Sequence, residues 1–258
     1  MMPAYLRQSQ LFWRVTGILL FLTLWEVIGR LGVVNRLFFA PLTDVLIAGA
    51  ILVGREDFLF HLSISMTEFI TGFVIAAAVG IPIGILVGWN ERLYQLVEPL
   101  LLAFNATPRI TLVPLLVIWF GVVGLASKIA MVFIGAVVPL LINTVAGVRD
   151  VDSSFINVAK SFGASRRFIF RTVVLPASVP FLLTGIRLGL GQGLIGMVVG
   201  ELYGATAGLG FLLSRYSANF QTDIVLFIIL LISLFGVLFT ELARKIEEHY
   251  QAWRTIVR

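Results

Sequence analysis

Long apolar runs alternate with short polar segments along almost the whole chain. A helix needs about 20 predominantly apolar residues to cross the hydrocarbon core of a membrane. Six runs reach this length, one of them with a polar interruption, whereas the apolar segment that follows Pro41 is too short to span. The six runs cover residues 12–31, 66–89, 98–120, 129–148, 176–203 and 223–242. This pattern predicts an all-α integral membrane protein with about six transmembrane helices.

The third apolar run contains polar residues in its middle. Asn105, Thr107, Pro108 and Arg109 interrupt an otherwise apolar sequence. An arginine in hydrocarbon costs about 2.5–3.5 kcal/mol on insertion scales, so Arg109 should face protein or water. Two interpretations remain. Either Arg109 lies at the cytoplasmic side after a short re-entrant piece, or it lines a polar pathway through the protein.

The fifth run is rich in glycine and carries two charges, Arg187 and Glu201. Small residues let membrane helices approach closely, which predicts a thin helix in the crowded centre of a bundle. The same argument predicts close packing for the glycine-containing second run. Arg187 and Glu201 are separated by about 21 Å along one helix and cannot pair with each other. Arg187 therefore either faces the pathway or pairs with a group elsewhere.

A basic segment, residues 151–176, separates the fourth and fifth runs and reads as two short helices. Asp152 or Ser153 can cap the first helix, because a short oxygen side chain accepts an unpaired backbone N–H. Gly163 is suited to end that helix. Pro176 is expected to stop the second helix, because proline lacks the N–H that a continuing helix needs.

The first of these two helices carries an apolar stripe. Phe155, Val158, Ala159 and Phe162 recur at helical spacing on one face. One interpretation is a basic amphipathic helix that lies on the membrane surface. The other is a docking element for a soluble partner.

Composition agrees with a membrane protein and excludes several kinds of site. Hydrophobic residues make up 59% of the 258 residues, charged residues 13%, and the mean hydropathy is +1.01, whereas soluble domains average about 25% charged residues. Cysteine is absent and only two histidines occur, which excludes disulfides, thiolate metal sites and a local histidine motif. The phosphate-binding motif G-x-x-x-x-G-K-S/T is absent too. We predict a single domain over residues 1–258 without catalytic, cofactor-binding or metal sites.

Positive charges indicate the orientation of the chain. The net charge is +5, and the arginines and lysines collect beside the apolar runs rather than in a patch for nucleic acid. Segment 149–171 is basic, as is the tail with Arg244, Lys245, Arg254 and Arg258. Because cytoplasmic loops are enriched in Lys and Arg, both should be cytoplasmic. Six spans then place both termini on the cytoplasmic side of the membrane.

The basic segment also contains a motif with fixed spacing. Asn157-Val158-Ala159 is followed after three residues by Gly163, and after nine further residues by Val173 and then Leu175-Pro176. This arrangement resembles the cytoplasmic EAA loop of ABC importer permeases, with Asn157-Val158 in place of the usual Glu-Ala. Segment 108–121, PRITLVPLLVIWFG, is similar to the branch of that family that handles nitrate, taurine, alkanesulfonates and bicarbonate.

The resemblance implies a type I importer permease fold in a bacterial inner membrane and a set of partners. These are a cytoplasmic ABC ATPase dimer that holds ATP and Mg²⁺, a second permease subunit, most simply an identical copy, a periplasmic or lipid-anchored solute-binding protein, and membrane lipid. Residues 149–176, here called the coupling loop, would rest on the ATPase. The residues expected to make that contact are Asn157, Val158, Ala159, Lys160, Ser161, Phe162, Gly163, Ala164, Ser165 and Arg166.

The resemblance further implies import of a small oxyanion such as a sulfonate, taurine, nitrate or bicarbonate. The candidate pathway residues are Asn105, Thr107, Arg109, Arg187 and Glu201. Alternatives are the same architecture importing a heterocycle, such as a thiamine precursor or riboflavin, and a secondary carrier driven by an ion gradient. A membrane-embedded enzyme is disfavoured, because the sequence indicates no histidine cluster and no carboxylate pair inside the bundle.

Overall fold

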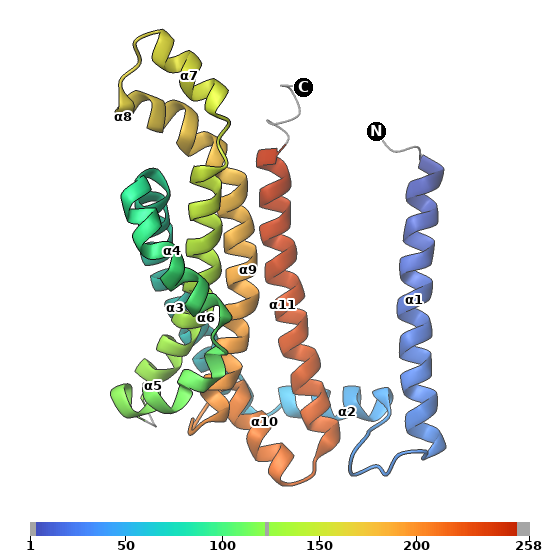
Figure 1. Ribbon diagram of the computed structural model, residues 1–258. Helices are drawn as coiled ribbons and strands as arrows, with labels where there is room; N and C mark the ends of the chain where they lie inside the picture. The colour runs from blue at the N-terminus through green and yellow to red at the C-terminus, as the bar shows by residue number, and fades with distance from the viewer. Residues whose placement is uncertain (1–3, 122–123, 252–258) are drawn as a thin grey trace. The chain divides into compact units, whose positions relative to one another are not determined.

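The computed structural model describes residues 4–121 and 124–251, and every regular element in these ranges is helical (Figure 1). The elements are α1 (Ala4–Leu31), α2 (Leu42–Val53), α3 (Glu56–Trp89), α4 (Glu91–Ala106), the 3-10 turn η1 (Arg109–Leu112), α5 (Val113–Phe120), α6 (Leu125–Arg149), α7 (Ser153–Ser161), α8 (Arg166–Ile169), the π-helical turn η2 (Phe170–Val174), α9 (Leu175–Leu202), α10 (Leu209–Ala218) and α11 (Thr222–Gln251).

Several helices are long and apolar enough to cross a membrane. Within the described ranges these are Asp57–Trp89, Leu125–Arg149, Arg166–Leu202 and Thr222–Glu248. Glu91–Ala106 and Arg109–Phe120 qualify together as a further span that is bent by 93° at its break. The prediction of an all-α membrane protein is confirmed, and the break falls where the polar interruption of the third run predicts it. The predicted number of about six spans is not reached, because the first run, residues 12–31, lies in α1, which is not among the spans of the described residues. Arg254 and Arg258 of the expected basic tail lie outside the described residues.

The described residues form two compact units. One contains residues 4–61 and 212–231, and the other contains residues 62–211 and 232–251. In the first unit, the Trp25 indole N–H donates to the Ala40 carbonyl at 3.0 Å, and the Thr43 backbone N–H donates to Glu26 at 3.0 Å. Glu26, a charge inside the first apolar run, thereby caps the start of α2. A single domain over the whole chain stays a prediction.

The second unit is built around α6 and α9, which lie side by side with α7 and α8 at one shared end (Figure 1). Their axes approach closely at glycines. A Cβ atom added to Gly135 would lie 2.6 Å from the Gln192 carbonyl oxygen, and one added to Gly196 would lie 2.5 Å from the Met131 carbonyl oxygen. α3 packs on α6 in the same way, since a Cβ at Gly84 would lie 2.6 Å from Thr144 Cβ. The close packing predicted for both glycine-rich runs is confirmed.

Candidate functional site

The coupling loop begins with a capped helix. The Asp152 carboxylate accepts the Ser154 backbone N–H at 2.8 Å, which satisfies one of the unpaired donors at the start of α7. The same hydrogen bond lowers the pKa of Asp152 below its ordinary value, because it favours the charged form. Asp152 therefore stays ionised at neutral pH and fixes where α7 starts.

Gly163 makes the turn that ends α7. Its φ is +75°, and the N–H groups of Gly163 and Ala164 donate to the carbonyls of Lys160 at 2.9 Å and Ala159 at 3.0 Å. These two bonds close the helix end as a left-handed glycine does in the Schellman motif. Ser165 then caps α8, because its Oγ accepts the Phe168 N–H at 3.3 Å. The helix–glycine–helix arrangement predicted from the sequence is present.

The return into the membrane differs from the prediction. Pro176 was expected to end the second helix, but the helix runs without interruption from Arg166 to Leu202. The π-helical turn η2 precedes the proline, and the Leu175 N–H bonds back to the Phe170 carbonyl. Pro176 lies directly after this turn, and the shifted hydrogen-bond pattern accommodates its missing N–H. As a result, the coupling loop is rigidly continuous with α9.

A small apolar core fixes the base of the loop. Val148 from the end of α6, Ile169 from α8 and Val174 from η2 are buried together. The Trp89 ring at the end of α3 packs on Phe170, with ring centroids 5.1 Å apart. Motion of the loop is therefore coupled mechanically to α3 and α6 as well as to α9.

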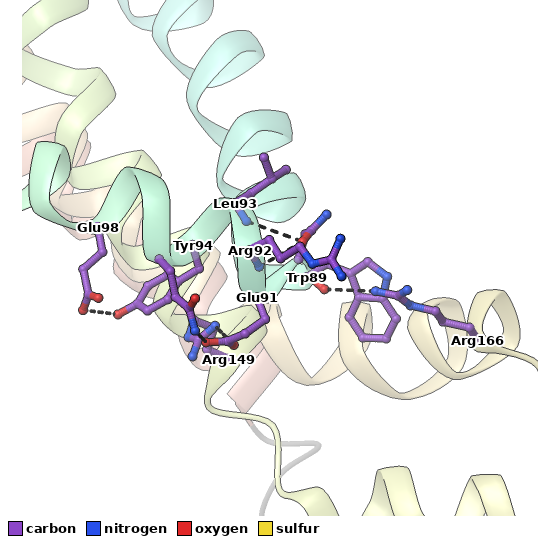
Figure 2. Close-up of polar contacts among 10 residues, drawn as sticks. Trp89, Glu91, Arg92, Leu93, Tyr94, Glu98, Arg149 and Arg166 are labelled. Carbon is purple, nitrogen blue, oxygen red and sulfur yellow. Dashed lines mark hydrogen bonds and ion pairs between the residues drawn. The ribbon is translucent and has the colours of Figure 1, made fainter.

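Polar contacts join the ends of α3, α4, α6 and α8 at the base of the loop (Figure 2). Arg149 at the end of α6 pairs with Glu91 at 2.8 Å, and its guanidinium lies 3.6 Å from the centroid of the Tyr94 ring. The guanidinium of Arg166 lies over the Trp89 ring at 5.2 Å. The sequence pattern does not predict these contacts, because Arg149 and Glu91 are far apart in sequence and no spacing pairs them.

The outer face of α7 is apolar and open to solvent. Phe155 and Val158 are more than half exposed, and Phe162 is 87% exposed. Ala159 from the predicted stripe points the other way and packs with Ile156 on the base of the loop. The stripe is thus divided between an inward and an outward face. The remaining predicted contact residues, Asn157, Lys160, Ser161, Gly163, Ser165 and Arg166, are exposed, and Ala164 is half-buried.

Three of the candidate pathway residues gather at the break between α4 and η1. Asn105 and Thr107 are exposed there, and the half-buried Arg109 donates from Nη1 to the Gln192 side-chain oxygen of α9 at 2.8 Å. The Nε of Arg109 is buried and has no hydrogen-bond partner. The sequence alone does not identify Gln192 as a partner of Arg109, because a single amide among glycines matches no motif.

The other two candidates lie elsewhere in the second unit. Arg187 faces Glu247 of α11, with Nε 3.2 Å from Oε2, and Thr184 donates to the same carboxylate at 3.0 Å. Glu201 is 1% exposed and sits beside Glu68 of α3. The sequence indicated no carboxylate pair in the bundle. That expectation is wrong, because helix packing joins Glu68 and Glu201 from two different runs. Within the described ranges, no group of three or more His, Asp or Glu side chains could hold a metal ion.

Comparison with known proteins places these features in context. The family described as "Binding-protein-dependent transport system inner membrane component" matches residues 80–250. A taurine transport system permease of Escherichia coli is 32% identical, over 90% of this chain and 86% of that protein. A formylaminopyrimidine transport permease of Halalkalibacterium halodurans is 29% identical, over 92% of this chain and 93% of that protein. Both relatives are transport permeases by name.

The fold also matches a solved structure. A chain from an inward-facing structure of the MetNI methionine ABC transporter aligns with a TM-score of 0.63 and 19% identity. The alignment covers 76% of this chain and 99% of that chain. The match shows that the helices are arranged as in a type I importer permease.

Proposed function

The chain belongs to the family of binding-protein-dependent transport system inner membrane components, and from this premise we propose that it is the permease subunit of an ATP-driven importer for a small oxyanion. In this proposal two permease subunits, most simply identical, form the pathway. An ABC ATPase dimer binds the coupling loops from the cytoplasm, and a solute-binding protein delivers cargo from the other side. Both termini are then cytoplasmic, and ATP with Mg²⁺ is held by the partner.

The observation that carries the ATPase partnership is the outward face of α7. Phe155, Val158 and Phe162 project apolar side chains from a loop that is stiffly joined to α6 and α9. Exposed apolar patches on soluble segments mark interaction sites. A docked ATPase would cover them, and its closure would move α6 and α9 through the continuous connection. A helix merely lying on lipid would need no such rigid attachment.

Replacing Phe162 with aspartate tests the docking. The variant should fold normally because the side chain is 87% exposed. It should weaken ATPase binding at least tenfold, since a buried aromatic anchor is worth about 2 kcal/mol or more in an interface. The measurement is co-purification and stimulated ATP hydrolysis of the reconstituted transporter. Phe162→Leu, which keeps the apolar contact, should retain most of the binding.

Wild-type binding and ATPase stimulation by Phe162→Asp would contradict the docking proposal. Transport by the reconstituted permease alone, driven by an ion gradient, would instead favour a secondary carrier.

Arg109 supports an anionic cargo. Its hydrogen-bond partner, Gln192, is neutral, and the ion pairs of the described residues include no carboxylate beside Arg109. Arg187, by contrast, is already balanced by Glu247. Irregular backbone at membrane depth is tolerated where it is buried in protein or lines a water-filled cavity. We therefore assign the exposed break around Thr107 to the pathway between the two subunits, with Arg109 as its anion-binding group.

Substitution of the two arginines separates these roles. Arg109→Gln should lower uptake of a sulfonate about 10- to 100-fold, because a charge-assisted hydrogen bond contributes about 1.5–3 kcal/mol. Arg187→Gln should lower the melting temperature while leaving the ratio of sulfonate to heterocycle uptake unchanged. The measurement is uptake of both cargo types by vesicles that contain the full transporter.

A heterocyclic cargo is the second candidate, favoured by the similarity to a formylaminopyrimidine permease. If Arg109→Gln leaves sulfonate uptake intact, or if only the heterocycle is transported, Arg109 is not an anion-binding group and the heterocycle becomes the better assignment.

A further inference from the structure

Four polar side chains are buried together in the second unit, away from the coupling loop. They are Ser65 and Glu68 of α3, Lys128 of α6 and Glu201 of α9, here called the buried acid cluster, and none is more than 2% exposed. Lys128 lies near the start of α6 and Glu201 near the end of α9. Because the coupling loop joins the opposite ends of these two helices, the cluster lies at the far end of the unit.

Glu201 uses both carboxyl oxygens as acceptors. The Ser65 hydroxyl donates to Oε1 and the Gly210 backbone N–H donates to Oε2, each at 2.5 Å. Ser65 Oγ in turn accepts the Leu209 N–H at 2.7 Å. Accepting at both oxygens is the role of an ionised carboxylate. Glu201 thus holds the backbone that starts α10.

The glycines of this turn make room for the carboxylate. A Cβ atom at Gly208 would lie 2.3 Å from Glu201 Oε1, and one at Gly210 would lie 2.6 Å from Glu201 Cβ. Gly208 also has a φ of +112°, a backbone angle that residues other than glycine rarely adopt. The two glycines therefore let the backbone of residues 208–210 pack directly against the Glu201 side chain.

Glu68 approaches the same carboxylate. Its side chain lies within hydrogen-bonding reach of Glu201, while its Oε2 is buried and has no partner. The titratable groups that face Glu68 are Glu201 from α9 and Lys128 from α6, and those that face Glu201 are Glu68 and Lys128. Two adjacent buried carboxylates cannot both be ionised without a large penalty. One proton on Glu68 leaves a single negative charge, which Lys128 balances.

We propose that Glu68 is a buried proton-binding site whose bound proton is donated to Glu201. The proton makes the buried acid cluster electrically neutral and supplies the hydrogen bond that joins α3 to α9. It thereby holds α3, α6, α9 and the turn at residues 208–210 together at the end of the unit opposite the coupling loop. The ligand is a proton, and no other cofactor is required.

Infrared spectroscopy of the full-length subunit in lipid vesicles tests the protonation directly. A protonated carboxylic acid has a C=O stretching band that an ionised carboxylate lacks. The wild type should show this band at neutral pH, and E68Q should lose it. E247Q is the matched control, because Glu247 is a buried carboxylate that pairs with Arg187, and the band should persist in it. Absence of the band from the wild type, or its persistence in E68Q, would overturn the proposal.

Thermal stability provides a second readout. E68Q keeps a donor toward Glu201 and the same net charge, so its melting temperature should match that of the wild type. E201Q replaces one of the two acceptor oxygens with an N–H₂ group that faces a donor, and its melting temperature should fall by several degrees. If E68Q is destabilised as much as E201Q, Glu68 is ionised in the native protein and the site holds no proton.

Discussion

Replacing Gly163 with valine is expected to reduce transport about tenfold while the subunit still inserts and folds. The turn at Gly163 has a φ of +75°, and a Cβ atom there would meet nothing within 4 Å. The expected loss therefore comes from backbone conformation alone and not from crowding. A side chain in the left-handed region costs about 1–2 kcal/mol, and about 1.4 kcal/mol is a tenfold change in population. The closed turn would then be depopulated.

The position offers a matched control. Asparagine adopts the left-handed conformation far more readily than valine, so Gly163→Asn should retain most of the transport. The measurement is uptake together with transport-stimulated ATP hydrolysis by the reconstituted complex, with insertion checked by the yield of purified subunit. Normal transport by Gly163→Val would show that the geometry of the coupling loop does not matter for coupling.

Much of the local structure follows from the sequence because its causes are local. Five of the six apolar runs coincide with spans, Asp152 caps α7, Gly163 turns the chain, and the polar residues before Arg109 mark the break. Each of these depends on a few neighbouring residues and on backbone hydrogen bonding. The family resemblance added the arrangement of helices, which periodicity alone does not contain.

The partners of the charged residues do not follow from the sequence. Arg187 pairs with Glu247 because α9 packs against α11. Glu68 lies beside Glu201 because α9 also packs against α3. Periodicity shows that a residue lies in a helix, but not which helix lies beside it. The prediction that Pro176 ends the second helix was wrong for a different reason. The rule about its missing N–H holds, but a π-helical turn shifts the hydrogen-bond pattern so that the helix continues.

The apolar stripe of α7 shows the same limit within a single helix. Helical spacing correctly groups Phe155, Val158, Ala159 and Phe162 on neighbouring positions. Whether such a face is buried or free depends on where the base of the loop lies. Ala159 and Ile156 pack against the core at the base of the loop, whereas Phe155, Val158 and Phe162 stay exposed. The three exposed residues of the stripe, which the sequence alone does not separate from Ala159, are the ones that a partner can contact.

Alanine substitutions at Gly196 and Gly191 should change stability in opposite directions although the chemical change is the same. Both glycines lie within α9. A Cβ atom at Gly196 would lie 2.5 Å from the Met131 carbonyl oxygen, whereas one at Gly191 would meet nothing within 4 Å. Because backbone cannot move aside as a flexible side chain can, Gly196→Ala should destabilise the subunit by about 1–3 kcal/mol. Gly191→Ala should stabilise it by about 0.5–1 kcal/mol.

The comparison isolates helix packing from helix propensity. It is made by thermal melting of the purified full-length subunit, with wild type and both variants in the same detergent. Equal effects of the two substitutions would mean that α6 and α9 do not approach as closely as their glycines allow. Since α6 and α9 carry the two ends of the coupling loop, a loosened contact at Gly196 should also lower coupled transport. The same change at Gly191 leaves that contact intact, so coupled transport there should stay unchanged.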